Sequence, residues 1–177
     1  MTIVGTPVHD LECAPGYYFS VIVARADDPR GAVEDFDGAT LAFNGPGSQS
    51  GWAAPQSLAD DKGIAFGATV ESGGHQASAQ AVLSGAADLA ALDAVTWEMI
   101  KRFDPWAIGL KELAKTPPTP ALPYVTARER VAPALYEALS TAVDQLDAAD
   151  RGMLRLTGIT SIPTGDYTAL PIPKAPG

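Results

Sequence analysis

The sequence predicts an α/β fold with a central, largely parallel sheet. Between residues 38 and 102, short apolar runs alternate with helical segments, which is the pattern of βαβ units. Hydrophobic residues make up 46% of the 177 positions, so the chain can build a substantial core. Because parallel strands end at the same edge of a sheet, the turns that lead into the helices should gather at that edge.

Two strands are expected before the alternating region. Residues 2–4 (TIV) have the composition of a short strand. Residues 17–25 (YYFSVIVAR) form a longer run with strong β character, bounded by turn residues on both sides. The segment between these strands shows no periodicity, so we expect a loop there.

Three strands and three helices are then expected in turn. The strands are predicted at 39–43 (ATLAF), 64–70 (IAFGATV) and 87–92 (ADLAAL). The helices are predicted from the glycine-rich turn NGPGSQSG to about residue 61, from the turn ESGGH to residue 84, and from 94 to 102. Pro55 requires the first of these helices to be kinked or to begin later than Ser50.

The C-terminal third begins with extended segments. Residues 108–116 (IGLKELAKT) are strand-like, and residues 116–126 (TPPTPALPYVT) contain too much proline for a helix. Thr126 and Glu129 fit a T-x-x-E capping box at the start of a helix.

That helix is predicted over residues 131–146, where apolar residues recur at helical spacing. A strand is expected at 153–156 (MLRL), and the tail at 171–177 (PIPKAPG) is expected to be disordered.

Charge and composition exclude several classes of function. The formal net charge of −9 does not favour binding to nucleic acid, and any anion site must be local. The chain has one cysteine, Cys13, so it forms no internal disulfide. No apolar run approaches the roughly 20 residues that span a bilayer. The chain as given begins without the pattern of an export signal, which would leave it cytoplasmic if this N-terminus is natural.

Three turns at the predicted sheet edge carry polar side chains that suit a small oxyanion. Ser48, Gln49 and Ser50 follow the first strand of the alternating region, His75 follows the second, and Asp93 follows the third. Hydroxyls and helix N-terminal amides can bind several oxygens of such a ligand. The alternative interpretation is structural: Ser50 and Asp93 also suit helix N-caps, and a histidine at a helix start is often a surface or capping residue.

Signals for catalysis and metal binding are weak. His9, Asp10, Glu12 and Cys13 stand at no recognised metal-ligand spacing, so no metal is expected. There is no G-x-S-x-G elbow, phosphate-binding P-loop or dinucleotide fingerprint, and no cofactor is implied. Serine hydrolysis through Ser50 and His75 lacks a supported third member. We therefore expect no enzymatic activity.

Three stretches of the sequence resemble a known family. They are ATLAFNGPGSQSGWAAP, VESGGHQASAQAVLSGAADLAALDAVTWEM and LKELAKTPPTPALPYVTA. Together they resemble the PhnD-like phosphate, phosphite and phosphonate substrate-binding proteins of ABC transporters, which have the type 2 periplasmic-binding fold. The resemblance runs from about residue 3 to 126 and more weakly to 146. Its most specific part is the ordered series S-x-S-G, G-x-x-x-S with a histidine, and A-D-x-A-A-x-D.

The resemblance implies a two-lobed receptor that closes on an oxyanion, with an ABC transporter permease as partner and a periplasmic or extracytoplasmic location. Residues that match the family's ligand-binding positions are Ser48, Gln49, Ser50, Gly51, His75 and Asp93. The family often has threonine where Gln49 stands. Tyr17 or Tyr18 would face the ligand in this scheme, and the alternative is an ordinary aromatic residue in a strand.

Family members normally carry further α/β elements before the position that matches Thr2. The resemblance therefore implies one complete oxyanion-binding lobe at 38–108 and a partial first lobe. Residues 1–37 would form a remnant of that lobe and a crossover strand, and residues 109–177 a second crossover, a helix and the tail. Such a remnant leaves apolar edges uncovered, so we expect a homodimer. The alternative function is a dimeric interaction or sensory domain without ligand transport.

Overall fold

The computed structural model describes residues 1–172, which form two compact units. Unit 1 is built from Met1–Tyr18 and Pro118–Leu170, and unit 2 is built on Phe19–Pro117. Up to Leu170, the chain passes between the units twice, after Tyr18 and after Pro117. Most of the tail that was expected to be disordered, from residue 173 onward, lies outside the described residues.

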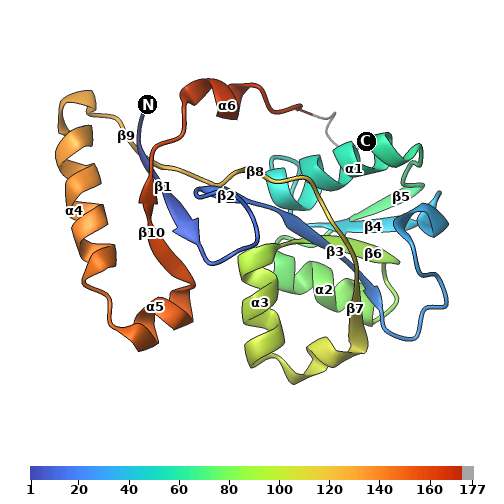
Figure 1. The fold of residues 1–177 in the computed structure, drawn as a ribbon. Coiled ribbons are helices and arrows are strands. Elements are labelled where there is room, and N and C mark those ends of the chain that lie inside the picture. Colours follow the sequence, from blue (N-terminus) through green and yellow to red (C-terminus); the bar gives the residue numbers. More distant parts are fainter. Residues whose placement is uncertain (173–177) are drawn as a thin grey trace. The chain divides into compact units, whose positions relative to one another are not determined.

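Unit 2 contains a five-stranded sheet in the order β5-β4-β6-β3-β7 (Figure 1). The strands are β3 (Ser20–Arg25), β4 (Thr40–Phe43), β5 (Ala68–Glu71), β6 (Leu89–Asp93) and β7 (Leu110–Lys115). β4 pairs in parallel with β5 and β6, whereas β3 is antiparallel to both β6 and β7. The α/β class is confirmed, with a mixed sheet because β3 runs against its neighbours.

Helices cover both faces of this sheet. They are the 3-10 helix η1 (Val33–Phe36), the π-helical turn η2 (Gln49–Ala53), α1 (Ala54–Lys62), α2 (His75–Leu83), α3 (Ala94–Phe103) and the 3-10 helix η3 (Pro105–Gly109). In Figure 1, α1 lies on one face and α2 and α3 lie on the other. This follows from the strand order, because β5 and β6 flank β4 and right-handed crossovers in opposite directions place their helices on opposite faces.

The core of unit 2 lies on both faces of the central strands. Ile22, Leu41, Phe43 and Leu89 point to the face that also buries Trp52 and Phe36. Their neighbours in the strands point to the other face, where Val82, Trp97 and Ile100 are buried. Each such side chain contributes about 1.5–3 kcal/mol through burial. The strands read as continuous apolar runs because both faces are covered.

Unit 1 has a three-stranded sheet in the order β10-β1-β9 and a small pair of strands, β2 and β8. The strands are β1 (Thr2–His9), β2 (Tyr17–Tyr18), β8 (Thr119–Pro120), β9 (Tyr124–Thr126) and β10 (Leu156–Thr160). The helices are the 3-10 helix η4 (Glu129–Val131), α4 (Ala132–Asp144), α5 (Ala148–Leu154) and α6 (Thr164–Thr168). β1 is antiparallel to both of its neighbours.

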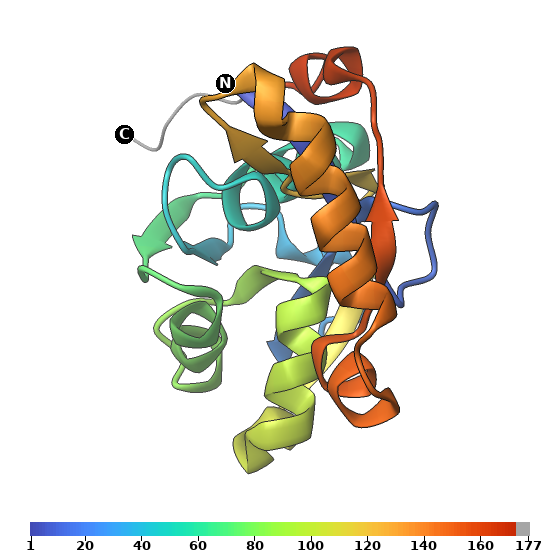
Figure 2. The same ribbon diagram turned by 90° about the vertical axis from the view of Figure 1, so that its left-hand side faces the viewer.

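Helix α4 packs along β1 and β10, as Figures 1 and 2 both show. Gly5 in β1 makes this close packing possible. A Cβ atom at Gly5 would lie 2.7 Å from Ile159 Cγ2 and 2.9 Å from Tyr136 Cδ2.

Three sequence predictions are corrected in the N-terminal and middle parts of the chain. The first strand is longer than residues 2–4 and continues to His9. The run predicted as one strand over 17–25 is divided at Phe19, because β2 pairs with β8 in unit 1 whereas β3 pairs with β6 and β7 in unit 2. The strand predicted over 64–70 begins only at Ala68, and Ile64 and Phe66 pack against the core from a loop.

Two further predictions are corrected near the C-terminus. The capping box does not form, because Thr126 Oγ1 accepts a hydrogen bond from the amide of Arg128 and the helix begins at Ala132, with Pro133 in its first turn. The segment MLRL is not a strand. Its first two residues end α5, which Asp147 caps by accepting from the amide of Asp150, and β10 starts at Leu156.

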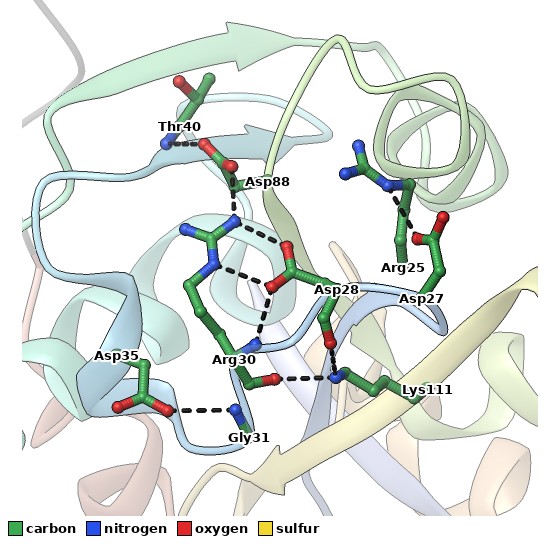
Figure 3. A network of polar contacts seen from close by, with 9 residues as sticks. All are labelled: Arg25, Asp27, Asp28, Arg30, Gly31, Asp35, Thr40, Asp88 and Lys111. Carbon is green, nitrogen blue, oxygen red and sulfur yellow. Dashed lines mark hydrogen bonds and ion pairs between the residues drawn. The ribbon is translucent and has the colours of Figure 1, made fainter.

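A charged network joins the loops at the sheet edge opposite to the βα turns of unit 2 (Figure 3). Arg30 Nη2 lies 2.7 Å from Asp28 Oδ2 and 2.8 Å from Asp88 Oδ1. Asp88 also accepts from the amide of Thr40, and Lys111 donates to the carbonyl oxygens of Asp28 and Arg30. The network therefore ties the loop after β3 to the starts of β4 and β6 and to β7.

Candidate functional site

The turn after β4 leads into a helix that starts with a π-helical turn. Ser48 caps this helix, because its Oγ accepts a hydrogen bond from the amide of Gly51 at 3.0 Å. The amide of Ala53 donates to the Ser48 carbonyl, and the amide of Ala54 donates to that of Gln49. Helix α1 follows from Ala54, so Pro55 stands in the first turn of the α-helix and causes no kink.

Ser50 does not have the capping role that was one interpretation of its position. Its residue is 8% exposed, and its Oγ lies 2.9 Å from His75 Nε2. Its carbonyl oxygen accepts a hydrogen bond from Ser20 Oγ at 2.9 Å. The serine therefore lies inside the first helical turn, with its hydroxyl directed to the second βα turn.

His75 is the first residue of α2 and brings an imidazole to the same place. Burial lowers the pKa of His75 below its ordinary value, while the negative charge of Asp93 acts in the opposite direction. The imidazole is therefore neutral near pH 7. The direction of the Ser50–His75 bond depends on which ring nitrogen carries the proton. With the proton on Nδ1, the ring can donate to the Ala91 carbonyl and Nε2 accepts from Ser50 Oγ. With the proton on Nε2, His75 donates to Ser50 Oγ, and the Ser50 hydroxyl can donate to a ligand.

The second βα turn is held by Ser72 rather than left open for a ligand. Ser72 Oγ contacts the Phe43 carbonyl, the Gly74 carbonyl and the buried Ser78 Oγ, at 3.0, 3.0 and 2.7 Å. These bonds attach the turn to β4 and to α2. They fix the start of α2 and with it the position of His75.

Asp93 ends β6 and caps α3, because its Oδ1 accepts a hydrogen bond from the amide of Thr96 at 2.9 Å. The capping interpretation of Asp93 is therefore correct. Its charge still acts on His75, so the third turn is close to the other two. One carboxylate oxygen takes part in the cap, and the second adds a negative charge to this edge of the sheet.

Gln49 and Gly51 complete the first turn. Gln49 is the first residue of the π-helical turn and is half-buried. Gly51 is buried, and a Cβ atom at its position would lie 2.0 Å from Asn44 Oδ1. Only glycine fits there while the Asn44 side chain keeps its place.

The two tyrosines belong to unit 1 rather than to unit 2. Tyr17 donates a hydrogen bond from its hydroxyl to Asp166 Oδ2 at 2.9 Å, and this bond raises the pKa of Tyr17 above its ordinary value. Tyr18 is 4% exposed and pairs with Thr119 in β8. The structure therefore brings together Ser48, Gln49, Ser50, Gly51, His75 and Asp93 in unit 2, and a role of Tyr17 or Tyr18 in ligand binding stays a prediction.

Ser20 and Thr116 are polar residues at this edge that sequence reasoning missed. They are 1% and 3% exposed, and they stand at the start of β3 and just after β7. The available signal was a single serine at the start of the apolar run VIVA. Its meaning depends on strand pairing, which no local pattern reveals.

Within residues 1–172, no group of three or more His, Cys, Asp or Glu side chains is arranged to hold a metal ion. The free Cys13 has its pKa raised by burial, and its Sγ contacts the Tyr17 carbonyl. None of the helices in the same residues is long and apolar enough to cross a bilayer.

Solved structures with the same architecture are periplasmic-binding-protein-like. PhnD1 from Prochlorococcus marinus in complex with methylphosphonate has a TM-score of 0.75 and 18% identity, over 93% of this chain and 66% of that one. The protein XAC2383 from Xanthomonas citri bound to ATP has a TM-score of 0.70 and 18% identity, over 96% of this chain and 68% of that one. A binding protein component of an ABC phosphonate transporter from Pseudomonas aeruginosa has a TM-score of 0.67 and 22% identity, over 88% of this chain and 55% of that one. The chain thus spans about two thirds or less of these proteins.

The sequence itself places the chain in a family. Residues 7–168 match the family described as ABC transporter, phosphonate, periplasmic substrate-binding protein. Because this match covers most of the sequence, the chain belongs to that family. It is a family of transport binding proteins rather than of enzymes. No curated protein sequence matched the chain.

Proposed function

We propose that this chain is the substrate-binding component of an ABC-type importer and that it binds a small oxyanion such as phosphate, phosphite or phosphonate. The observation that carries the proposal is the 2.9 Å contact between Ser50 Oγ and His75 Nε2 at the meeting point of two helix starts. The proposed ligand-binding residues are Ser48, Gln49, Ser50, Gly51, His75 and Asp93. The family membership supports the same class of ligand.

Helix geometry favours an anion at this edge. The first amides of a helix have no intrahelical acceptor, and the helix dipole adds a partial positive charge there. Ser48 satisfies the amide of Gly51, and within residues 1–172 the amides of Gln49 and Ser50 have no hydrogen-bond acceptor, so they can donate to ligand oxygens. With a net charge of −9, the chain needs such local donors to hold an anion. The Asp93 charge would favour a ligand that also carries a proton or a cationic group.

The Ser50–His75 pair is better explained as a ligand contact than as a nucleophile and its base. A serine nucleophile needs a histidine that a third group orients. Among the described residues, the Asp93 carboxylate accepts a hydrogen bond from the amide of Thr96 and not from His75. The family's role in transport agrees with binding without turnover.

The partners follow from the same proposal. A binding component of this type delivers its ligand to the permease of an ABC transporter, so we propose a permease partner and an extracytoplasmic location. The family is periplasmic.

A thermal-shift series tests the ligand class. Methylphosphonate, phosphite or phosphate should raise the unfolding midpoint of the wild-type chain, because a ligand that binds the native state stabilises it. Ser50→Ala should weaken binding by about tenfold or more, since a hydrogen bond to a charged ligand is lost. Ser84→Ala, which removes an exposed serine at the end of α2, is the matched control and should bind as the wild type does.

The opposite result would be an unchanged midpoint with all of these anions, and with sulfate, at millimolar concentration. It would contradict the proposed ligand class and favour the alternative function, a dimeric interaction or sensory domain without ligand transport.

We further propose that the chain forms a homodimer through unit 1. Within the described residues, β9 and β10 are the outer strands of their sheet and pair on one side only. In or beside β9, the side chains of Leu122, Tyr124 and Val125 are 77%, 42% and 49% exposed. Such an apolar edge is suited to pairing with another chain.

Light scattering on the purified protein tests this proposal. The expected result is twice the mass of the chain at micromolar concentration, and the mass of one chain for Val125→Lys, because a lysine on an edge strand opposes pairing. A wild-type protein with the mass of a single chain would show that these edges do not mediate self-association.

A further inference from the structure

Ser20 and Thr116 form a pair of buried polar residues beside the proposed ligand-binding turn. Both are almost completely buried, at 1% and 3% exposed. Burying a polar group is costly unless it is hydrogen-bonded, so the partners of these residues show what they do. The amide of Ser20 donates to Thr116 Oγ1, and the amide of Thr116 donates to the Ser20 carbonyl, both at 2.9 Å.

The Ser20 hydroxyl then connects this pair to the turn. Its Oγ donates to the Ser50 carbonyl oxygen at 2.9 Å. Ser50 therefore contacts His75 through its side chain, and β3 holds Ser50 in place through its backbone carbonyl. Movement of β3 or of Ser20 would move Ser50 directly.

Pro55 explains why the Ser50 carbonyl needs a donor from outside the helix. The π-helical turn is closed by amides that donate to the carbonyl five residues earlier, namely those of Ala53 and Ala54. The corresponding donor for Ser50 would be the amide of residue 55, which is proline and has no N–H group. The Ser20 hydroxyl takes the place of that missing donor.

We propose that Ser20 and Thr116 are positioning residues that hold the Ser48–Ala53 turn in its ligand-binding geometry. They act through Ser50 and make no contact with the ligand themselves. This inference rests on the proposed function for its effect on affinity. It also has a consequence that requires no ligand, because Ser20 reaches His75 through contacts within the chain, from Ser20 to Ser50 and from Ser50 to His75.

The ligand-free consequence can be measured by NMR titration of the histidines. The chain contains two histidines, His9 in unit 1 and His75 in unit 2. Ser20→Ala should loosen the turn and admit water to the His75 imidazole, so the His75 pKa should rise towards the ordinary value of about 6.5. Ser20→Thr keeps the hydroxyl and should preserve the wild-type titration. Thr116→Val should shift His75 in the same direction as Ser20→Ala.

A double-mutant cycle with methylphosphonate as the probe completes the test. Ser20→Ala should weaken binding by about fivefold, the usual effect of one lost hydrogen bond. In the Pro55→Ala background, where residue 55 regains an N–H group, the same substitution should have a clearly smaller effect. Equal effects in the two backgrounds would contradict the role given to Pro55.

The two proposals fail in different ways. A wild-type protein that binds no oxyanion would contradict the proposed function, and the His75 titration would still decide the positioning role. If Ser20→Ala leaves both the His75 titration and the affinity for methylphosphonate unchanged, the positioning role is wrong. If Ser20→Ala does not fold, Thr116→Val provides the same two measurements.

Discussion

Replacing Arg30 with methionine is expected to lower the free energy of unfolding by about 3 kcal/mol, because the substitution leaves a buried carboxylate without its partner. The Asp28 side chain is 4% exposed, and Arg30 contacts it through both Nε and Nη2 (Figure 3). In the variant, this carboxylate keeps the hydrogen bond from the backbone amide of residue 30 and the attraction of the Lys111 charge. Arg30 also packs over the fully buried ring of Phe36, at 3.9 Å from its centroid.

Arg25→Met is the matched control. Arg25 forms an ion pair with Asp27 at 3.2 Å, but these side chains are 39% and 84% exposed. An exposed pair contributes less than about 1 kcal/mol, so this variant should unfold almost as the wild type does. Urea denaturation at pH 7 measures the free energy of unfolding of both variants. If Arg25→Met and Arg30→Met lower the free energy of unfolding equally, the burial of Asp28 does not determine how much stability is lost.

The same network predicts how stability depends on pH. Hydrogen bonds from Arg30 hold the pKa of Asp28 far below its ordinary value, and those from Arg30 and Thr40 lower that of Asp88. A carboxyl whose folded pKa is lowered stabilises the fold fully above its unfolded pKa of about 3.9. This stabilisation is lost as the pH falls from there towards the folded pKa. The difference in the free energy of unfolding between the wild type and Arg30→Met should therefore be constant near neutral pH and shrink below about pH 4.

Gly51→Ala is expected to abolish detectable binding of methylphosphonate and to lower the free energy of unfolding by about 2 kcal/mol. The new Cβ atom would lie 2.0 Å from Asn44 Oδ1, 2.9 Å from Asn44 Cγ and 3.3 Å from the Asn44 amide nitrogen. Because Asn44 directly follows β4, relief of this clash must move its side chain or the turn. Movement of the turn also breaks the bond from the Gly51 amide to Ser48 Oγ.

Gly47→Ala, in the same turn, is the control. Among residues 1–172, and apart from Gly47 and its two chain neighbours, no atom lies within 4 Å of a Cβ atom placed at Gly47. The turn should therefore keep its geometry and its ligand affinity. Calorimetric titration with methylphosphonate gives the affinity of the Gly51→Ala and Gly47→Ala proteins, and thermal unfolding gives their stability. In a helix without a clash, glycine to alanine stabilises by roughly 0.5–1 kcal/mol. A more stable Gly51→Ala protein would therefore contradict the assigned packing.

Unit 2 could be predicted well because its signals are local. β4, α2, β6 and α3 lie close to the expected positions, since each is an apolar run or a helical stretch bounded by glycine, serine or aspartate. Their order along the chain was sufficient to place three turns at one edge. The contact between Ser50 and His75 is a geometric consequence of that order.

The remaining features depend on pairing between distant segments. The division of residues 17–25 into β2 and β3 cannot be read from an uninterrupted apolar run, because it arises from a change of partner at Phe19. The bond from Ser20 to Ser50 depends likewise on the position of β3 in the sheet. Near the C-terminus, Asp147 caps α5, and the apolar run MLRL does not by itself show that its first two residues end a helix.

The order of the two units along the chain also has a consequence for biosynthesis. All five strands of the unit 2 sheet lie in the continuous stretch Phe19–Pro117, whereas unit 1 is assembled from segments on either side of that stretch. In unit 1, Thr2 pairs with Thr126 and Thr6 with Thr160, so β1 must wait for both partners until all of unit 2 has left the ribosome. We expect unit 2 to fold first during translation, because it lacks no part of its sheet at that stage. β1, which precedes all of unit 2 along the chain, is then among the last strands to be paired.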